Sequence, residues 1–295
     1  MRLLNASGCL DALTAPDMAR SLDAFVTKTV TPRPREGNAP VRIAEAGTGM
    51  LNSIGLANPG IDRFLAEALP RLRSLGMPIW VSVGGFAASE YADLCARLDG
   101  RGEVSTIELN LSCPNVEEAP ESVAEIVLAC RQATGKPLYA KLSPATSDIA
   151  AVARAVETAG ADGLSLVNTI RGLALDERTL APRLATATGG YSGAPLKPIA
   201  LACVYACRRV TSLPIVGMGG VQTGRDALEL LAAGATAVAL GTVLFADPQA
   251  PSRVRADLGA EARLCGFADP AEAVGAAHQA RDRVTAGRDQ TKVAV

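Results

Sequence analysis

Residues 214–243, PIVGMGGVQTGRDALELLAAGATAVALGTV, decide the fold of this chain. The stretch begins with the apolar run PIVGMGG (214–220), continues with the amphipathic segment GRDALELLAAGA (224–235) and ends with a second apolar run, AVALGTV (237–243). Short apolar runs on both sides of a helical pattern are typical of two parallel strands joined by a crossover helix. A glycine close to the end of the segment is a usual helix stop. The stretch therefore predicts a βαβ unit.

The same pattern recurs along the chain. Further strands are predicted at AFVTKTV (24–30), IWVSVGG (79–85), TIELNLS (106–112), LYAKLSP (138–144) and GLSLVNT (163–169). Amphipathic segments such as IDRFLAEALPRLRSLG (61–76) separate most of them. We place an eighth strand in the glycine-rich TGGYSG (188–193), and the whole order predicts a (β/α)8 TIM barrel of class α/β. A doubly wound sheet is the alternative, but no GxGxxG fingerprint follows any of the strands.

Length and composition favour one large domain. The chain has 295 residues, 48% of them hydrophobic and 3% aromatic, and no linker or change of composition divides it. We therefore expect residues 1–295 to form a single domain. The 29 basic residues nearly balance the 30 acidic ones and form no basic stripe, so a nucleic-acid partner is not expected.

Neither a membrane span nor a cysteine framework is expected. No apolar run reaches the roughly 18 residues needed to cross a bilayer, and the start MRLLNASGCL has too short an apolar stretch for a signal peptide. The 7 cysteines are scattered without a CxxC pair, which argues against disulfides and against a cysteine-bound zinc or iron–sulfur site. Cys203 and Cys207 lie one helical turn apart and are interpreted as packing residues. We expect a cytoplasmic protein.

Two long segments, 31–60 and 170–200, show no periodic pattern. Loops of this length in a domain are usually lids or binding loops. Because both follow predicted barrel strands, we expect them at the carboxyl-end face, where barrel enzymes keep their active sites.

Polar residues follow the strands, and two of them are lysines. Lys28 and Lys141 lie within apolar strand patterns, where an unpaired ammonium group is costly. They indicate an anionic partner, although two structural lysines held by salt bridges would give the same pattern.

Glycines follow the last two predicted strands. Gly219-Gly220 ends the first of these runs, and Gly241-Thr242 lies near the end of the second. Barrels often bind phosphate at this place through backbone N–H groups and a helix N-terminus. The pattern therefore predicts a phosphate site without identifying its ligand.

The single histidine offers no base at the predicted active face. His278 lies in a helical segment beyond the last strand and is interpreted as a surface or packing residue. Without histidine there, common metal sites are not expected, and proton transfer must involve Cys, Lys, an acid or a hydroxyl. Cys113 in NLSCPN (110–115) is a candidate, since a thiol at a strand exit can be inert, a ligand or reactive.

The order of these motifs resembles the dihydroorotate dehydrogenase family over nearly the whole chain. The matching stretches are SGC (7–9), KTVTPRPREGN (28–38), GMLNSIGLANPG (49–60), ELNLSCPNV (108–116), KLSP (141–144), NT (168–169), GGYSGAPLKP (189–198), GMGG (217–220) and GT (241–242). The resemblance implies an FMN-binding (β/α)8 barrel that oxidises dihydroorotate to orotate in de novo pyrimidine biosynthesis.

The resemblance also implies a subclass and a role for the thiol. Class 1 members use a cysteine on the NLSCPN loop as the base for the C5 proton, so that role falls to Cys113; class 2 members use serine there and carry an N-terminal membrane-binding extension. This chain starts directly at LNASGC, and SGAPLKPIAL (192–201) looks like class 1B. Class 1B subunits pass electrons from FMN to NAD through a partner subunit that carries FAD and a 2Fe–2S cluster. A homodimer, or a heterotetramer with that partner, is then expected.

Residue by residue, the resemblance implies two overlapping sets of contacts. Substrate contacts fall to Lys28, Asn52, Ser53, Ile54, Gly55, Leu56, Asn110, Asn168 and Thr169. FMN contacts fall to Ser7, Lys28, Thr29, Ser82, Asn110, Lys141, Val167, Gly193, Gly219, Gly220, Gly241 and Thr242. Three features depart from the family pattern: Ser82 stands where many members have Asn, Thr29 replaces a smaller residue, and most of the usual N-terminal hairpin is missing.

Two other functions remain open at this point. One is an FMN-dependent reductase like that of dihydropyrimidine dehydrogenase, which shares the cysteine loop and the asparagines. The other is a non-catalytic barrel that binds a phosphorylated ligand. A comparison of dihydroorotate with dihydrouracil as substrates separates the first from the leading hypothesis, and FMN uptake tests the second.

Overall fold

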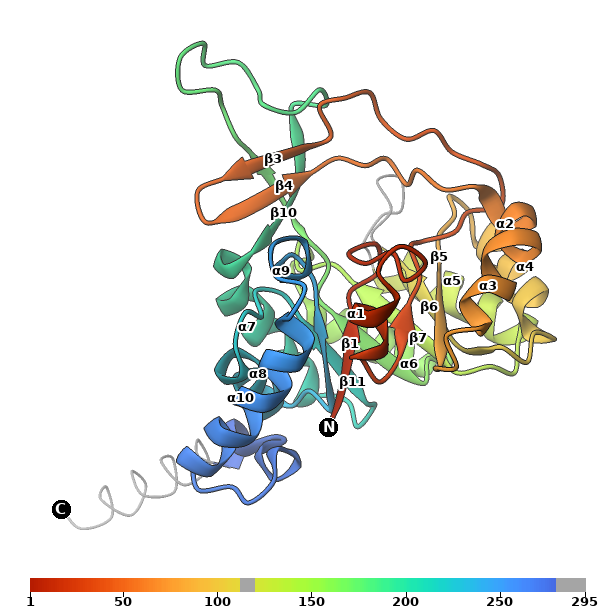
Figure 1. Cartoon of the computed structure of the whole chain (residues 1–295). Helices are drawn as coiled ribbons and strands as arrows, with labels where there is room; N and C mark the ends of the chain where they lie inside the picture. Colours follow the sequence, from red (N-terminus) through yellow and green to blue (C-terminus); the bar gives the residue numbers. More distant parts are fainter. Residues whose placement is uncertain (112–119, 280–295) are drawn as a thin grey trace.

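A parallel sheet of eight strands curls into a barrel in the computed structural model, which describes residues 1–111 and 120–279 (Figure 1). The strand order is β1-β12-β11-β8-β7-β6-β5-β2. A bridge between Leu4 and Ala24 brings the two end strands together and closes the ring. The strands are β1 (Arg2–Asn5), β2 (Phe25–Val26), β5 (Ile79–Val83), β6 (Val104–Asn110), β7 (Leu138–Leu142), β8 (Gly163–Leu166), β11 (Ile215–Met218) and β12 (Ala237–Leu240). The predicted (β/α)8 barrel is thus confirmed.

The eighth barrel strand is not the one predicted. TGGYSG forms strand β10 (Thr188–Gly193), which pairs antiparallel with two strands outside the barrel. The missing barrel strand is β1, at the start of the chain, where the short run RLLN gives only a weak strand signal. The prediction was wrong because glycines in TGGYSG serve close packing: a Cβ on Gly190 would lie 2.1 Å from Oγ1 of Thr169.

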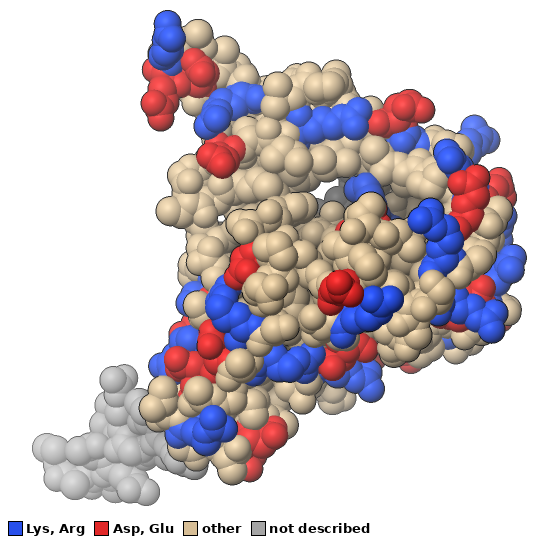
Figure 2. All heavy atoms as spheres, viewed as in Figure 1, with Lys and Arg blue, Asp and Glu red and all other residues tan. Residues whose placement is uncertain are grey.

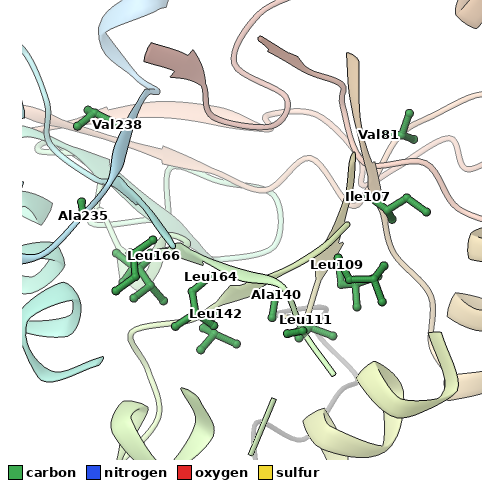
Figure 3. Close-up of a cluster of buried hydrophobic side chains, with 14 of the residues drawn as sticks. Val81, Ile107, Leu109, Leu111, Ala140, Leu142, Leu164, Leu166, Ala235 and Val238 are labelled. Atoms are coloured by element: carbon green, nitrogen blue, oxygen red, sulfur yellow. The ribbon is translucent and has the colours of Figure 1, made fainter. Parts of the chain in front are cut away.

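Helices cover the outside of the barrel. They are α1 (Pro16–Arg20), α2 (Gly60–Arg63), the π-helical turn η1 (Phe64–Ala68), α3 (Leu69–Arg73), α4 (Ala88–Asp99), α5 (Pro120–Ala133), α6 (Ile149–Thr158), the 3₁₀ turn η2 (Ala194–Leu196), α7 (Lys197–Arg208), α8 (Gly224–Ala233), α9 (Val243–Ala246), α10 (Ala250–Leu264) and the 3₁₀ turn η3 (Pro270–Ala273). Alternate residues of the strands, such as Ile107, Leu109 and Leu164, point outward and are fully buried against these helices (Figure 3). This contact forms the main hydrophobic core.

The barrel interior changes character along its axis. Trp80 and Tyr139, with ring centroids 4.5 Å apart, belong to an apolar interior cluster. Two residues further along the same strands, Ser82 and Lys141 also point inward, because strand side chains alternate. The polar part of the interior therefore lies toward the carboxyl ends of the strands.

A second sheet lies over the carboxyl end of the barrel (Figure 1). Its order is β3-β4-β10-β9, and all its pairings are antiparallel. It combines β3 (Ile43–Ala46) and β4 (Gly49–Asn52) from the segment 31–60 with β9 (Ile170–Leu173) and β10 from 170–200. The two segments that show no periodic pattern thus form a joint layer, and the space-filling surface is hollowed between it and the barrel (Figure 2).

Two further expectations concern the surface. Lys and Arg side chains are mixed with Asp and Glu over the face shown in Figure 2, with no basic stripe. Within the part of the chain that the structure describes, no helix is long and apolar enough to cross a membrane.

Candidate active site

A chain of hydrogen bonds crosses the mouth of the barrel. Asn168, just after β8, donates from Nδ2 to Oδ1 of Asn110 at 3.2 Å, and Asn110 donates from Nδ2 to Oγ1 of Thr29 at 3.1 Å. The Thr29 hydroxyl lies 3.1 Å from that of Ser82 and 3.4 Å from that of Ser7. Five predicted site residues, each in or after a different barrel strand, are therefore linked by direct contacts at the carboxyl-end face.

Ser82 is part of the site even though it departs from the family pattern. The residue is fully buried, and its hydroxyl contacts Thr29, the other departure. The two residues that depart from the family pattern are therefore in direct contact. A methyl of Thr29 also lies 2.9 Å from where a Cβ on Gly84 would be, so this corner is tightly packed.

The two lysines differ in their surroundings. Lys141 is buried, and its Nζ lies 3.8 Å from Oε1 of Glu108, which is 1% exposed. Among the described residues, Lys28 makes no ion pair. Its side chain is reached by solvent through the open mouth, yet protein surrounds it: burial lowers the pKa of its ammonium, and nearby Cys9 acts in the opposite direction. One lysine thus has a structural partner, while the other faces the mouth without one.

Cys9 lies between the lysines and the last strand. Burial raises the pKa of its thiol, against the opposing effect of Lys141 and Lys28. Its Sγ would be 3.8 Å from a Cβ placed on Gly241. The loop of the SGC motif therefore lines the site on the side of β1 and β12, and its thiol is protonated at neutral pH.

The predicted substrate residues meet at the layer above the barrel. Asn52 donates from Nδ2 to the carbonyl of Gly190 at 3.3 Å, and a Cβ on Gly190 would strike Thr169. Asn52 and Thr169 are therefore neighbours, next to Asn168 in the hydrogen-bond chain.

The turn at 53–56 is held by its own partners. The Ser53 hydroxyl accepts from Asn38 at 2.8 Å and from Thr186 at 2.6 Å, and the Ile54 carbonyl accepts from the Asn38 backbone. Gly55 and Leu56 both have positive φ, +71° and +57°. These residues shape the layer, and among the described residues no hydrogen bond joins them to the barrel interior.

The predicted phosphate residues gather at the ends of β11 and β12. Gly219 and Gly220 have positive φ, and a Cβ on Gly220 would lie 2.6 Å from the backbone N of Lys197 at the start of α7. At Gly241, by contrast, a Cβ would make only ordinary contacts, 3.6 Å being the shortest. The first two glycines are required by the backbone, whereas Gly241 is required neither by its backbone nor by its neighbours.

Two contacts complete this corner. Thr242 donates from Oγ1 to Oγ of Ser192 at 2.9 Å, which joins the loop after β12 to β10. Gly193, with φ +97°, follows directly and leads into η2 and α7. Val167, buried at 3% exposure, bonds through its N–H to the carbonyl of Met218 and so lies between β8 and β11.

Asp226 holds the loop that follows Gly219-Gly220 through hydrogen bonds to its backbone. Its carboxylate accepts hydrogen bonds from the backbone N–H of Gln222 and Thr223, each at 2.9 Å, and from Nζ of Lys197 at 2.6 Å. Thr223 and Asp226 form a capping box that starts α8. Burial raises the pKa of the Asp226 carboxyl, but these hydrogen bonds outweigh it, so that the pKa is lowered.

Some predicted features lie elsewhere. Cys113 and its loop are outside the described residues. His278 stacks on Tyr205, with ring centroids 4.0 Å apart, and is a packing residue far along the chain from the site. Cys207 is buried in α7, as expected for packing. Within residues 1–111 and 120–279, no cluster of His, Cys, Asp and Glu could hold a metal ion.

Glu108 and Ser192 were not singled out from the sequence. Glu108 carries the same signal as the lysines, a charge inside an apolar strand pattern, and it was overlooked within ELNLSCPNV. Ser192 gave no signal of its own, since a serine in a glycine-rich stretch usually marks a turn.

Comparisons with known proteins identify the family of this chain. The sequence model of the family described as dihydroorotate dehydrogenase matches residues 2–261. Proteins named dihydroorotate dehydrogenase B (NAD(+)), catalytic subunit, are 47% identical over 245 residues in Latilactobacillus sakei, covering 80% of each chain, and 46% identical over 234 residues in Listeria monocytogenes, covering 77% of each. In Trichlorobacter lovleyi, a protein of the same name is 44% identical over 262 residues, covering 86% of each chain.

One solved structure shares the fold. The crystal structure of DHODH in complex with ferulenol from Eimeria tenella superimposes with a TM-score of 0.79 at 23% identity, over 94% of this chain and 85% of the other.

Proposed function

Because the chain belongs to the dihydroorotate dehydrogenase family, in the group of its class 1B catalytic subunits, we propose that it oxidises dihydroorotate to orotate with bound FMN and passes the electrons on through a partner subunit. The observation that carries the proposal is the hydrogen-bond chain from Asn168 through Asn110 to Thr29. It brings amide groups and a hydroxyl together at one barrel mouth, beneath a layer built from two distant segments.

The residues at the mouth fit FMN. A phosphate is compatible with the backbone of Gly219-Gly220, where close neighbours leave no room for a side chain, and with the backbone of Gly241, which carries no side chain. Asp226 and Lys197 fix the shape of this corner without occupying it. At the other end, buried Lys141 would lie at the pyrimidine edge of the flavin, where an ammonium stabilises negative charge.

The substrate would bind between the barrel mouth and the second sheet. Amide side chains can donate to a carboxylate and accept from ring N–H groups, and Asn52, Asn110 and Asn168 supply both functions from two sides. Lys28, which has no ion pair among the described residues, would offset the charge of the substrate carboxylate. The antiparallel layer would exclude water from above.

The chemistry divides between the thiol of Cys113 and the cofactor. Sγ of Cys113 would take the proton from C5 of dihydroorotate, by the family resemblance. Bound FMN would supply the acceptor for the hydride that leaves C6, so that a C5=C6 double bond forms. Orotate then carries two hydrogens fewer, one gone as a proton and one as a hydride.

The relatives' names include NAD and a catalytic subunit, which supports a separate electron-transfer subunit for this chain. We propose that FAD and a 2Fe–2S cluster belong to that subunit, because the cysteines here have no cluster spacing. Homodimeric and heterotetrameric assembly, residues 1–295 as one domain, and a cytoplasmic location all stay predictions.

The test is the absorbance of the purified protein in the flavin bands under anaerobic conditions. Addition of dihydroorotate should bleach the bands within the mixing time of a stopped-flow instrument, and dihydrouracil should not. Bleaching by dihydrouracil instead would favour the dihydropyrimidine reductase. A colourless protein that takes up no FMN would contradict the proposal and favour the non-catalytic barrel.

A further inference from the structure

A buried carboxylate lies under the candidate flavin site. Glu108 is 1% exposed and points into the barrel from β6, two residues before Asn110. Within the described part of the chain, its Oε1 has no hydrogen-bond partner, and the same holds for Oγ of Ser165 on β8. Ser165 is the register partner of Lys141, so both orphan atoms flank this lysine.

The Lys141 ammonium forms an ion pair with this carboxylate. Nζ of Lys141 lies 3.8 Å from Oε1 of Glu108, and the two side chains are 7% and 2% exposed. At that separation the pair attracts electrostatically but makes no hydrogen bond of normal length. A buried charge is costly unless it is paired, so each group depends on the other. This ion pair nevertheless leaves both the carboxylate and the ammonium able to make further hydrogen bonds.

The position of Glu108 and Lys141 in the barrel determines which side of the ammonium faces the carboxylate. Lys141 is the register partner of Asn110, and Glu108 precedes Asn110 by one inward-facing position. Glu108 therefore holds Lys141 from the interior side, while the opposite side of the ammonium faces the barrel mouth. A flavin at the mouth would share Lys141 with a carboxylate that is already present.

We propose that Glu108 is a positioning residue that acts through Lys141 to set the preference of the site for reduced over oxidised FMN. The inference rests on the proposed function. Reduction places negative charge on the flavin pyrimidine, which a lone lysine would favour strongly. Glu108 offsets part of that positive charge, so that the flavin is not held in its reduced form and can release electrons to the next carrier.

The experiment compares Glu108→Gln with the unaltered protein. Dissociation constants are measured for oxidised and for anaerobically reduced FMN, by quenching of flavin fluorescence and by ultrafiltration. Loss of the negative charge should raise the ratio of the oxidised to the reduced constant about tenfold, which corresponds to about +30 mV for a two-electron couple. A ratio unchanged within twofold, or one that falls, overturns the proposal.

A double-mutant cycle tests whether Glu108 acts through the lysine. In a Lys141→Met background, Glu108→Gln should leave the ratio unchanged, because the ammonium on which it acts is gone. A full shift in that background would mean that Glu108 acts directly on the flavin, and the proposal would be wrong. Glu108→Asp retains the charge and should keep a ratio near that of the unaltered protein, which covers the case in which Glu108→Gln does not fold.

A matched control removes another carboxylate near the site. Asp226→Asn acts at the phosphate corner, so it should weaken both redox forms equally and leave the ratio constant.

The apoprotein gives a readout without flavin. Glu108→Gln should lower its midpoint of thermal unfolding more when Lys141 is present than in the Lys141→Met background. Protein that takes up no FMN would refute the proposed function, whereas additive effects on apoprotein unfolding would refute the Glu108–Lys141 pair. The two failures are therefore distinguishable.

Discussion

Asn168 donates a hydrogen bond to the side-chain oxygen of Asn110, and this contact joins strands β8 and β6 across the intervening β7. Lys141 lies on that intervening strand, so the two amides bridge the part of the barrel mouth that contains the buried lysine. The contact belongs to a longer network: Oδ1 of Asn168 also accepts from the backbone of Thr169, and Nδ2 of Asn110 donates to Thr29.

The amide pair should behave as a unit. Asn110→Ala should weaken orotate binding roughly 5- to 150-fold, the range for a lost hydrogen bond that leaves buried partners unsatisfied by about 1–3 kcal/mol. Asn168→Ala should cost a similar amount. Because they share a hydrogen bond, the double variant should lose less than the product of the two effects. Titration of orotate by flavin absorbance measures all three, and strictly additive losses would show that the residues act independently.

A carboxylate side chain at Gly220 should prevent FMN binding. Gly220→Asp introduces bulk where a Cβ would already lie 2.6 Å from the backbone N of Lys197, at a positive φ, and adds negative charge beside the phosphate. FMN should be absent from the purified variant. Gly102→Asp is the control, since nothing lies within 4 Å of a Cβ at that position. Full FMN occupancy in Gly220→Asp would place the phosphate elsewhere.

Asp226 should contribute stability that depends on pH. Its pKa in the folded protein is lowered, so the contribution is fully present above the unfolded value of about 3.9 and is lost as pH falls through the folded value. Asp226→Asn should therefore destabilise the apoprotein by about 1–3 kcal/mol at pH 7, and the difference should shrink below pH ~4. Urea unfolding at several pH values measures it.

The control for this variant is Asp93→Asn, which removes an exposed carboxylate on α4. It should change stability little at any pH. A gap between Asp226→Asn and the unaltered protein that stays constant down to pH 3 would show that the charge of Asp226 contributes nothing.

The strand and helix order could be read from the sequence because each βαβ unit carries its own local signal. TIELNLS and IWVSVGG fall on β6 and β5, and AVALGTV contains β12. AFVTKTV was less well predicted: only Phe25–Val26 form a strand, with one further bridge at Val30. Its polar residues Thr27, Lys28 and Thr29 interrupt the apolar pattern, and Thr29 belongs to the hydrogen-bond chain of the candidate site.

The second sheet could not be read in this way. Its strands pair residues far apart, such as Asn52 with Gly190, and neither segment alone shows an alternating pattern. Pairing of distant strands depends on the barrel beneath bringing them together. The Glu108–Lys141 pair is of the same kind, because neighbouring parallel strands set its geometry.

The route of the electrons gives a further prediction. The chain contains no GxGxxG fingerprint, so the purified subunit should reduce its own flavin with dihydroorotate but turn over poorly with NAD. Addition of the FAD and iron–sulfur subunit should restore turnover with NAD. Efficient NAD reduction by this chain alone would contradict the need for a partner, and rapid turnover with fumarate would indicate a class 1A enzyme. Steady-state assays with each acceptor decide.

The last prediction concerns the base. Cys113 lies outside the described residues, and its proposed role rests on the family resemblance and on the absence of histidine at the barrel mouth. The other thiol at the site, Cys9, has a pKa raised by burial, so it is a poor base at neutral pH. A free thiol ionises near pH 8.5 (roughly), and only a few per cent is thiolate at pH 7. Flavin reduction should therefore accelerate as pH rises toward that value.

Substitution of Cys113 should separate chemistry from binding. Cys113→Ala should keep its FMN and bind orotate nearly normally, since neither needs the thiol, while flavin reduction should slow by about 10²–10⁴-fold, the usual effect of removing a positioned base. Cys113→Ser should retain slightly more activity, and only at higher pH, because a hydroxyl is the weaker acid. Cys265→Ala, at an exposed position after α10, is the control and should reduce its flavin normally. Stopped-flow absorbance across a pH series measures each rate. If Cys113→Ala reduces its flavin within a few-fold of the unaltered protein, the thiol is not the base, and Lys28, whose pKa is lowered by burial, becomes the next candidate.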